Sequence, residues 1–211
     1  MQDRYFAFFD LDHTLTRADT GFAFLRWWAR RHPWVLWRFL LAPLALLLWK
    51  AHIISLRHIK EFFFSVLHGK SAAEVDAAAR AFVDDSFEKL VKEDARLYLA
   101  EIAPLYHLVL ASASPEFYVR YFAEKLGFAL YVATLYEFRD GIFTGRMEGP
   151  DCRGEEKMRR ILGRILLTRY DREHSLAFSD NVRLDAPLLS LAGNAFRVHR
   201  TKWRFKPVLI E

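Results

Sequence analysis

Short apolar runs alternate along the chain with longer stretches of helical periodicity. Residues 4–9 are almost entirely apolar or aromatic and end at Asp10, which predicts a strand buried on both faces of a parallel sheet. Similar apolar runs predict further strands at 105–111, 130–133, 175–179 and 195–198. The last of these runs precedes a basic tail.

Helix signals separate the strands. Ser71 and Glu74 have the spacing of a capping box, which predicts a helix that runs toward Leu90. The segment Ser114-Pro115-Glu116 is typical of an N-cap, a first helical proline and a first-turn acid, and Gly127 would end that helix. Residues 154–167 predict one more helix.

Strands that alternate with helices predict an α/β fold with a doubly wound parallel sheet. Residues 17–95 carry helical patterns and almost no strand signal, and this stretch is too long for an ordinary crossover. We therefore expect a core formed by 1–16 and 96–211, with a helical cap inserted at 17–95. Asp140-Gly141, between apolar neighbours, predicts a type I′ hairpin.

Composition bounds the class of protein. A chain of 211 residues with 53% hydrophobic residues can fold around one core with a modest insertion. Its one cysteine, Cys152, excludes an internal disulfide framework and favours a reducing compartment. The first residues lack the pattern of a secretory signal, so we expect a cytoplasmic protein, either free or at the inner face of the membrane.

The chain is basic, with a formal net charge of +5 and a pI near 9.4. Such a surface attracts nucleic acid, anionic lipid or phosphorylated metabolites, unless the charge is ordinary surface lysine and arginine. No nucleic-acid-binding motif is present, so nucleic acid is not an expected partner. Residues 20–60 contain no Asp or Glu and hold five of the six tryptophans.

Polar groups follow four predicted strands or begin the helices after them. They are the segment Asp10-Leu11-Asp12-His13-Thr14, then Ser112, Lys157, and the pair Asp180 and Asp185. In an open α/β sheet, ligands bind outside the carboxyl ends of the strands. A single strand-terminal Asp or Ser is usually a helix cap, but four such groups predict a shared site.

These residues resemble the motifs of the haloacid dehalogenase phosphatases. Phe9-Asp10-Leu11-Asp12-His13-Thr14-Leu15 resembles the first motif, and Ser112, Lys157 and Asp180 with Asp185 are similar to the second, third and fourth. The segments 112–117 and 152–157 and the predicted hairpin resemble the phosphoserine-phosphatase-like branch. The resemblance covers residues 4–19 and 105–198.

The resemblance implies a magnesium-dependent phosphatase. Asp10 would be the nucleophile that forms an aspartyl-phosphate, and Asp12 would protonate the leaving oxygen and then activate water. Mg²⁺ would bind the Asp10 carboxylate, the Asp12 backbone carbonyl and the Asp180 carboxylate, with Asp185 in support. Lys157 would neutralise Asp10 and phosphate.

The resemblance also implies hydroxyl donors to phosphate at Ser112 and Thr14. Ser114 competes for the role of the second-motif serine, but we expect it to cap the helix that follows. Asp19 stands where phosphoserine phosphatases carry a glutamate that binds the substrate amine, and its shorter side chain weakens that expectation.

The remaining polar candidates are expected to be structural. His13 is predicted to be a loop residue, and Cys152 a packed thiol rather than a nucleophile. Zinc is not expected, because metal-ligand spacing is absent among the other histidines considered, His52, His58, His68 and His107.

The predicted cap contains an apolar run, Phe39–Trp49, bounded by Arg38 and Lys50 and interrupted by Pro43. This run is too short to span a membrane but suits a helical hairpin lying in the interface. It could equally be buried inside the cap or between subunits, and the oligomeric state stays open. Arg- and Trp-rich cap helices before such a core also resemble phosphatidylglycerophosphatase C.

The expected partner is therefore a phosphorylated small molecule such as phosphoserine, or a phospholipid headgroup such as that of phosphatidylglycerophosphate. In the second case the cap would make peripheral membrane contact. A catalytically silent anion- or membrane-binding module that keeps the fold is the alternative.

Overall fold

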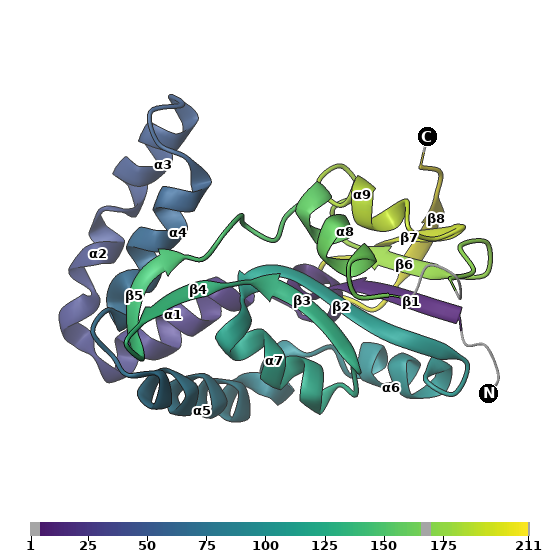
Figure 1. Ribbon diagram of the computed structural model, residues 1–211, viewed down its shortest axis with the longest axis horizontal. Coiled ribbons are helices and arrows are strands. Elements are labelled where there is room, and N and C mark those ends of the chain that lie inside the picture. The colour runs from purple at the N-terminus through teal and green to yellow at the C-terminus, as the bar shows by residue number, and fades with distance from the viewer. Residues whose placement is uncertain (1–4, 166–169, 211) are drawn as a thin grey trace.

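A six-stranded sheet forms the centre of the molecule (Figure 1). The computed structural model describes residues 5–165 and 170–210. The strands, in spatial order, are β3 (Leu130–Thr134), β2 (Tyr106–Pro115), β1 (Tyr5–Asp10), β6 (Leu176–Ser179), β7 (Asn194–Val198) and β8 (Phe205–Val208). The first five are parallel, and β8 pairs antiparallel with β7. The predicted α/β class is confirmed.

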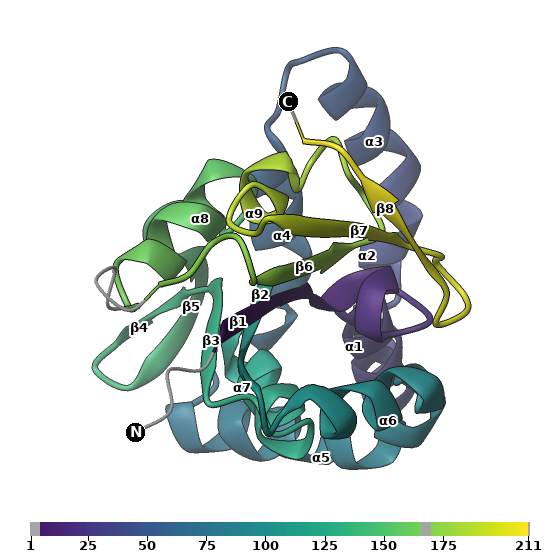
Figure 2. The same cartoon turned by 90° about the vertical axis from the view of Figure 1, so that its right-hand side faces the viewer.

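Helices cover both faces of the sheet (Figure 2). On one face, Phe8 and Val109 pack with residues of α8 (Glu155–Leu162) and α9 (Ala186–Leu189). On the other face, Phe9 and Leu110 belong to a larger core that includes residues of α6 (Glu93–Ile102) and α7 (Glu116–Lys125). Alternate residues of β1 thus enter different cores, which is why this strand is apolar throughout.

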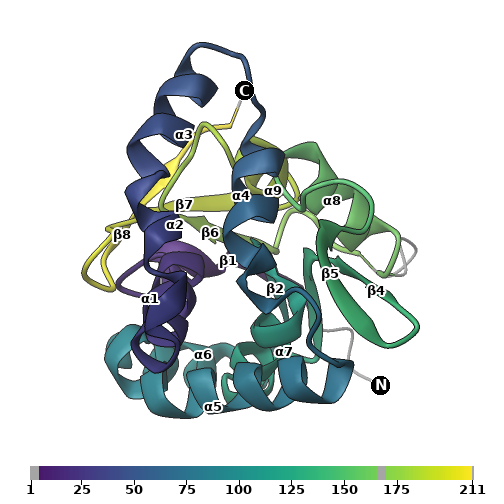
Figure 3. The same cartoon turned by 90° about the vertical axis from the view of Figure 1, so that its left-hand side faces the viewer.

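The chain between β1 and β2 is helical. After a single irregular turn at Leu11–Leu15 come α1 (Thr20–Arg31), a 3₁₀ turn (Pro33–Val35), α2 (Trp37–Leu40), α3 (Ala42–Lys50), α4 (Leu56–Phe64), a second 3₁₀ turn (Ser65–Leu67) and α5 (Ala72–Leu90). Segments α2 and α3 rise from the body, and α4 returns beside them (Figure 3). The division into core and cap at residues 16/17 and 95/96 stays a prediction.

The hairpin of β4 (Tyr136–Arg139) and β5 (Ile142–Met147) packs on this helical segment. Phe143 exchanges backbone hydrogen bonds with Gly69 and Lys70, at 3.0 and 2.8 Å. At its turn, Asp140 and Gly141 have φ values of 50° and 76°, as a type I′ turn requires. The predicted hairpin is confirmed, and β5 contacts α4, α5 and the 3₁₀ turn Ser65–Leu67.

Several local predictions can be compared directly with the structure. Ser71 and Glu74 form the predicted capping box of α5. The prediction that Ser114 caps α7 is wrong, because Ser114 lies within β2 and Pro115 occupies the N-cap without a side-chain bond. The helix predicted over 154–167 ends at Leu162, and residues 166–169 lie outside the described residues.

Candidate active site

The nucleophile candidate lies at the carboxyl end of the central strand. Asp10 is the last residue of β1, and the chain then turns sharply through Leu11–Leu15, where His13 adopts a left-handed φ of 59°. The Thr16 amide closes the turn by donating to the Leu11 carbonyl at 3.1 Å, and the Thr16 hydroxyl accepts from the His13 amide at 3.3 Å. Both aspartates of the segment are therefore held at one edge of the sheet.

Asp10 forms an ion pair with Lys157, although 147 positions separate them in the chain. Lys157 Nζ lies 2.6 Å from Asp10 Oδ1 and 2.8 Å from Asp185 Oδ1. Ser179 Oγ donates to the other Asp185 oxygen at 2.6 Å, so Asp185 orients the ammonium group from behind. All four side chains are buried. The predicted supporting role of Asp185 toward a metal ion stays a prediction, and the contact observed is with Lys157.

Thr14 links the first and fourth motifs. Its hydroxyl donates to Asp10 Oδ2 and accepts from the Asp180 amide, both at 3.0 Å. Because this buried hydroxyl has one proton, already directed at Asp10, Thr14 fixes the two aspartates relative to each other. The Asp180 carboxylate forms an ion pair with Arg200 at 3.1 Å.

Asp12 faces β2 and the start of α1. Its Oδ1 accepts from the Thr20 amide at 2.6 Å, and its Oδ2 accepts from Ser114 Oγ at 2.6 Å. Ser112 Oγ lies 3.5 Å from the same oxygen and accepts from the Ser114 amide at 3.0 Å. Both serines thus line the site, and Ser114 is the one that bonds closely to Asp12.

Burial raises the pKa of Asp10. Desolvation raises the pKa of Asp10 to about 8, with Asp185 and Asp12 adding repulsion and Lys157 opposing it. Desolvation lowers the pKa of Lys157, but Asp10 and Asp185 outweigh it and raise the pKa above its usual range. A second cation beside Asp10 would favour its ionised form.

The donor set fits a hard divalent cation. Among the residues that the structure describes, the four carboxylates of the site, from Asp10, Asp12, Asp180 and Asp185, form direct ion pairs with two cations, Lys157 and Arg200. Within residues 5–165 and 170–210, no cluster of three His, Cys, Asp or Glu side chains is arranged as a metal site. The predicted set needs only two carboxylates and one backbone carbonyl, because Mg²⁺ keeps several waters.

Three further charged residues, Lys92, Lys60 and Arg200, contact the site but were not predicted from the sequence. Lys92 is buried and donates to the carbonyls of His13 and Thr14, at 2.8 and 2.7 Å. Lys60 of α4 bonds to Asp151 and to the Ala113 carbonyl, between Ser112 and Ser114. Lys60 lies in the acid-free stretch, which was a usable signal, whereas Lys92 and Arg200 occupy ordinary basic surroundings in the sequence.

Asp19 caps α1 by accepting from the Phe22 amide at 2.7 Å. Cys152 is buried, and burial raises the pKa of its thiol to about 11, which confirms a packed thiol.

The sequence model of one hydrolase family matches most of this chain. The profile of the haloacid dehalogenase-like hydrolases covers residues 7–190, including Asp10, Lys157 and Asp180. The chain belongs to the haloacid dehalogenase-like hydrolase family. Its motifs and its α/β fold are those expected from the sequence.

One relative of this haloacid dehalogenase-like chain is named as a phosphoserine phosphatase. It is 27% identical over 198 residues to phosphoserine phosphatase SerB1 of Mycobacterium tuberculosis, covering 92% of this chain and 64% of that protein. The chain thus spans less than two thirds of that relative.

Solved structures share the fold. A Bordetella pertussis protein described as of unknown function superposes with a TM-score of 0.76 at 26% identity, covering 92% of this chain and 89% of that one. A phosphoserine phosphatase in apo form gives a TM-score of 0.60 at 18% identity, covering 91% and 84% of the two chains. At that identity the second likeness establishes the fold alone.

Proposed function

We propose that this haloacid dehalogenase-like protein is a phosphatase that cleaves phosphate monoesters through a phosphorylated Asp10. The contact that carries the proposal is the placement of Asp10 at the end of β1, between Lys157 and Thr14. A carboxylate held in this way is a positioned nucleophile, and positioning removes much of the barrier to phosphoryl transfer.

The neighbouring side chains supply the rest of the reaction. An Asp10 oxygen attacks phosphorus, the ester bond breaks, and the leaving oxygen takes a proton from Asp12. Water then attacks the phosphorus of the aspartyl-phosphate and passes a proton to Asp12, which releases inorganic phosphate and restores Asp10. Lys157 neutralises the charge that develops on the phosphoryl oxygens, and Ser112 offers a hydroxyl donor.

Asp10, Asp180 and the Asp12 backbone carbonyl are the proposed ligands of Mg²⁺. When bound, the cation supplies the positive charge that lets a carboxylate and a phosphate approach each other. Thr14 already ties Asp10 to Asp180 through two hydrogen bonds, so these ligands are held together by the chain itself.

The proposed substrate is a phosphorylated small molecule, with phosphoserine as the first candidate because of the mycobacterial relative's name. Asp19 caps α1 with one oxygen, so amine recognition there would depend on the other. A phospholipid monoester is the second candidate, favoured by the exposed apolar surface of α2 and α3. The intact set of hydrogen-bonded or ion-paired site residues speaks against a silent binding module.

A screen of phosphate esters tests this function. Purified protein is assayed with Mg²⁺ against para-nitrophenyl phosphate, phosphoserine and phosphatidylglycerophosphate in detergent micelles. Asp10→Asn should lower kcat by at least about a thousandfold while preserving the circular dichroism spectrum. Excess EDTA should stop turnover, and added Mg²⁺ should restore it. Near-wild-type turnover by Asp10→Asn would refute the assignment.

A further inference from the structure

The helical stretch Pro33–Lys50 presents an apolar surface to solvent. This 18-residue stretch has a mean hydropathy of 1.3, and only 6% of it is buried. Leu40 is 79% exposed, Leu47 63% and Trp37 50%. Further exposed side chains are Leu36, Leu41, Leu44, Leu46, Trp49 and Ile53. So many large apolar side chains exposed in one short stretch mark an interaction site.

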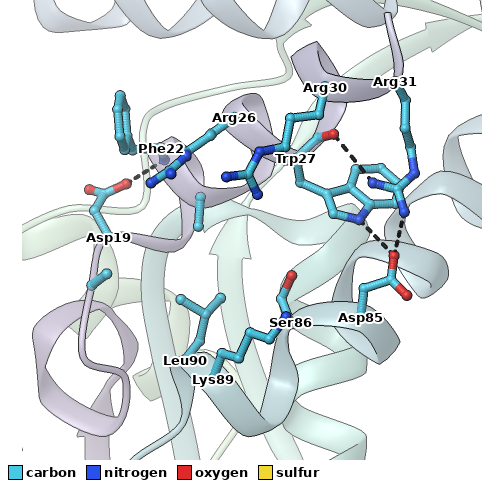
Figure 4. Close-up of a pocket in the computed structure, with 12 residues that line it drawn as sticks. Asp19, Phe22, Arg26, Trp27, Arg30, Arg31, Asp85, Ser86, Lys89 and Leu90 are labelled. Atoms are coloured by element: carbon cyan, nitrogen blue, oxygen red, sulfur yellow. Dashed lines mark hydrogen bonds and ion pairs between the residues drawn. The ribbon is translucent and has the colours of Figure 1, made fainter.

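Basic side chains border this surface. A groove of about 280 Å³ runs between α1 and α2, lined by apolar residues together with Arg26 and Arg30. The same two arginines line a larger cavity of about 680 Å³ between α1 and α5, together with Lys89 (Figure 4). Within the described residues, Arg26, Arg30 and Lys89 have no ion-pair partner, whereas Arg31 pairs with Asp85. Arg26 and Arg30 thus adjoin the apolar surface, since both line a groove with Leu36 and Phe39.

The stretch cannot cross a membrane as a single span. Its length and composition would suit a span, but α1 before it packs into the larger core and α4 after it packs against β5. Arg57 of α4 bonds to the carbonyls of Met147 and Gly149, and Lys60 bonds to Asp151. Both ends of the stretch are therefore held on the same side, which leaves a hairpin lying in the interface.

The positive charge around this surface indicates which kind of partner binds there. Residues 20–60 carry seven Lys or Arg and no Asp or Glu. Two copies of the chain that met face to face through this surface would bring like charges together. An anionic lipid surface has the opposite charge and an apolar interior, and Trp side chains favour its boundary.

We propose that α2 and α3 dock this protein on an anionic membrane surface, with Arg26 and Arg30 meeting lipid phosphates. The leucines enter the acyl boundary while the arginines stay at headgroup level. This docking is independent of the reaction at Asp10, because the residues that carry it are distinct from the catalytic ones. It holds or fails whatever the substrate is.

The test is co-sedimentation of the full chain with vesicles of phosphatidylcholine, alone or with one third phosphatidylglycerol. Wild-type protein should bind the mixed vesicles, and raising the salt concentration should weaken this binding. The double variant Leu40→Glu/Leu47→Glu should reduce the bound fraction at least about tenfold, because it removes apolar contact and adds repulsion. Arg26→Gln/Arg30→Gln should weaken binding to the mixed vesicles alone.

The matched control is Leu97→Glu, an equally exposed leucine on α6. It should bind the mixed vesicles as wild type does. Circular dichroism and turnover of para-nitrophenyl phosphate check that each variant folds. The docking is refuted if wild-type protein ignores the mixed vesicles, or if the double variant binds them as wild type does. It is also refuted if wild type is a dimer in light scattering that the double variant converts to monomers.

Discussion

Lys92 places its ammonium group beneath the loop that follows β1. Its three protons go to three backbone carbonyls, those of His13, Thr14 and His199, at 2.8, 2.7 and 2.9 Å. Burial lowers the pKa of Lys92 to about 8. The lysine therefore ties the loop after β1 to the segment that follows β7.

Lys92→Met should lower the free energy of unfolding by about 3 kcal/mol, because it leaves buried carbonyls without donors. Chemical denaturation measures this change. Lys89→Met, on the exposed side of α5, is the control and should change stability by less than about 0.5 kcal/mol. Equal free energies of unfolding for the two variants would show that the hydrogen bonds of Lys92 do not stabilise the fold.

Cys152 should take no part in catalysis. Because the thiol is buried and its pKa is about 11, it stays protonated at pH 8 and should resist iodoacetamide until the protein is unfolded. Cys152→Ala should retain phosphatase turnover in the same assay. Rapid alkylation of the folded protein, or loss of activity in a folded variant, would contradict this account.

Site residues with a fixed place on a strand end or a helix start could be predicted from the sequence. Asp10, Lys157 and Asp180 belong to this class, because the topology of a parallel sheet brings such positions together. Ser114 was misassigned because Ser-Pro-Glu is typical of a helix start, whereas β2 continues to Pro115 and turns the serine toward Asp12. Lys92 depends on tertiary contacts that no local pattern encodes.

At the scale of elements, the contact between β5 and the 3₁₀ turn Ser65–Leu67 needs a glycine. Gly145 has a φ of 78°, and a Cβ there would lie 2.8 Å from the Ser65 Cβ. Gly149 has a similar φ of 71° but no neighbouring atom within 4 Å of such a Cβ. Alanine at either position would strain the backbone, but only at Gly145 would it also clash with a neighbouring side chain.

Gly145→Ala should therefore destabilise the protein by about 2 kcal/mol more than Gly149→Ala. Thermal unfolding followed by circular dichroism compares the two variants. Equal losses would mean that the hairpin does not pack closely on this turn.

Most elements were predictable because their patterns are local. The buried strands are short apolar runs, and the capping box of α5 and the Asp140-Gly141 turn follow from residue chemistry. Strand β8 was missed because its residues read as a basic tail and include Pro207. As an edge strand paired only with β7, it tolerates proline and needs no apolar run.

At the scale of the molecule, Lys60 connects α4 to the edge of the sheet where the candidate site lies. Its Nζ lies 3.0 Å from the Ala113 carbonyl and 2.8 Å from Asp151 Oδ2. Thr134 also bonds to both Ala113 and Asp151, so one network fixes the end of β2. Because Ala113 lies between Ser112 and Ser114, a shift of α4 would displace the two serines beside Asp12.

Lys60→Met should lower kcat/KM for a soluble phosphate ester by about tenfold, because small displacements of positioning groups are costly to catalysis. Lys50→Met, at the exposed end of α3, should leave kcat/KM unchanged. An unaltered kcat/KM in folded Lys60→Met would show that the position of α4 does not control the site.

The central claim concerns Asp10 itself, and its most direct test is to trap the covalent intermediate. Protein mixed with Mg²⁺ and phosphate ester is quenched in acid within milliseconds, digested and examined by mass spectrometry. We expect the mass of one phosphoryl group on Asp10, and none in the Asp10→Asn variant. A label on another residue, or turnover with no phosphorylated enzyme under conditions of fast transfer and slow hydrolysis, would contradict the account.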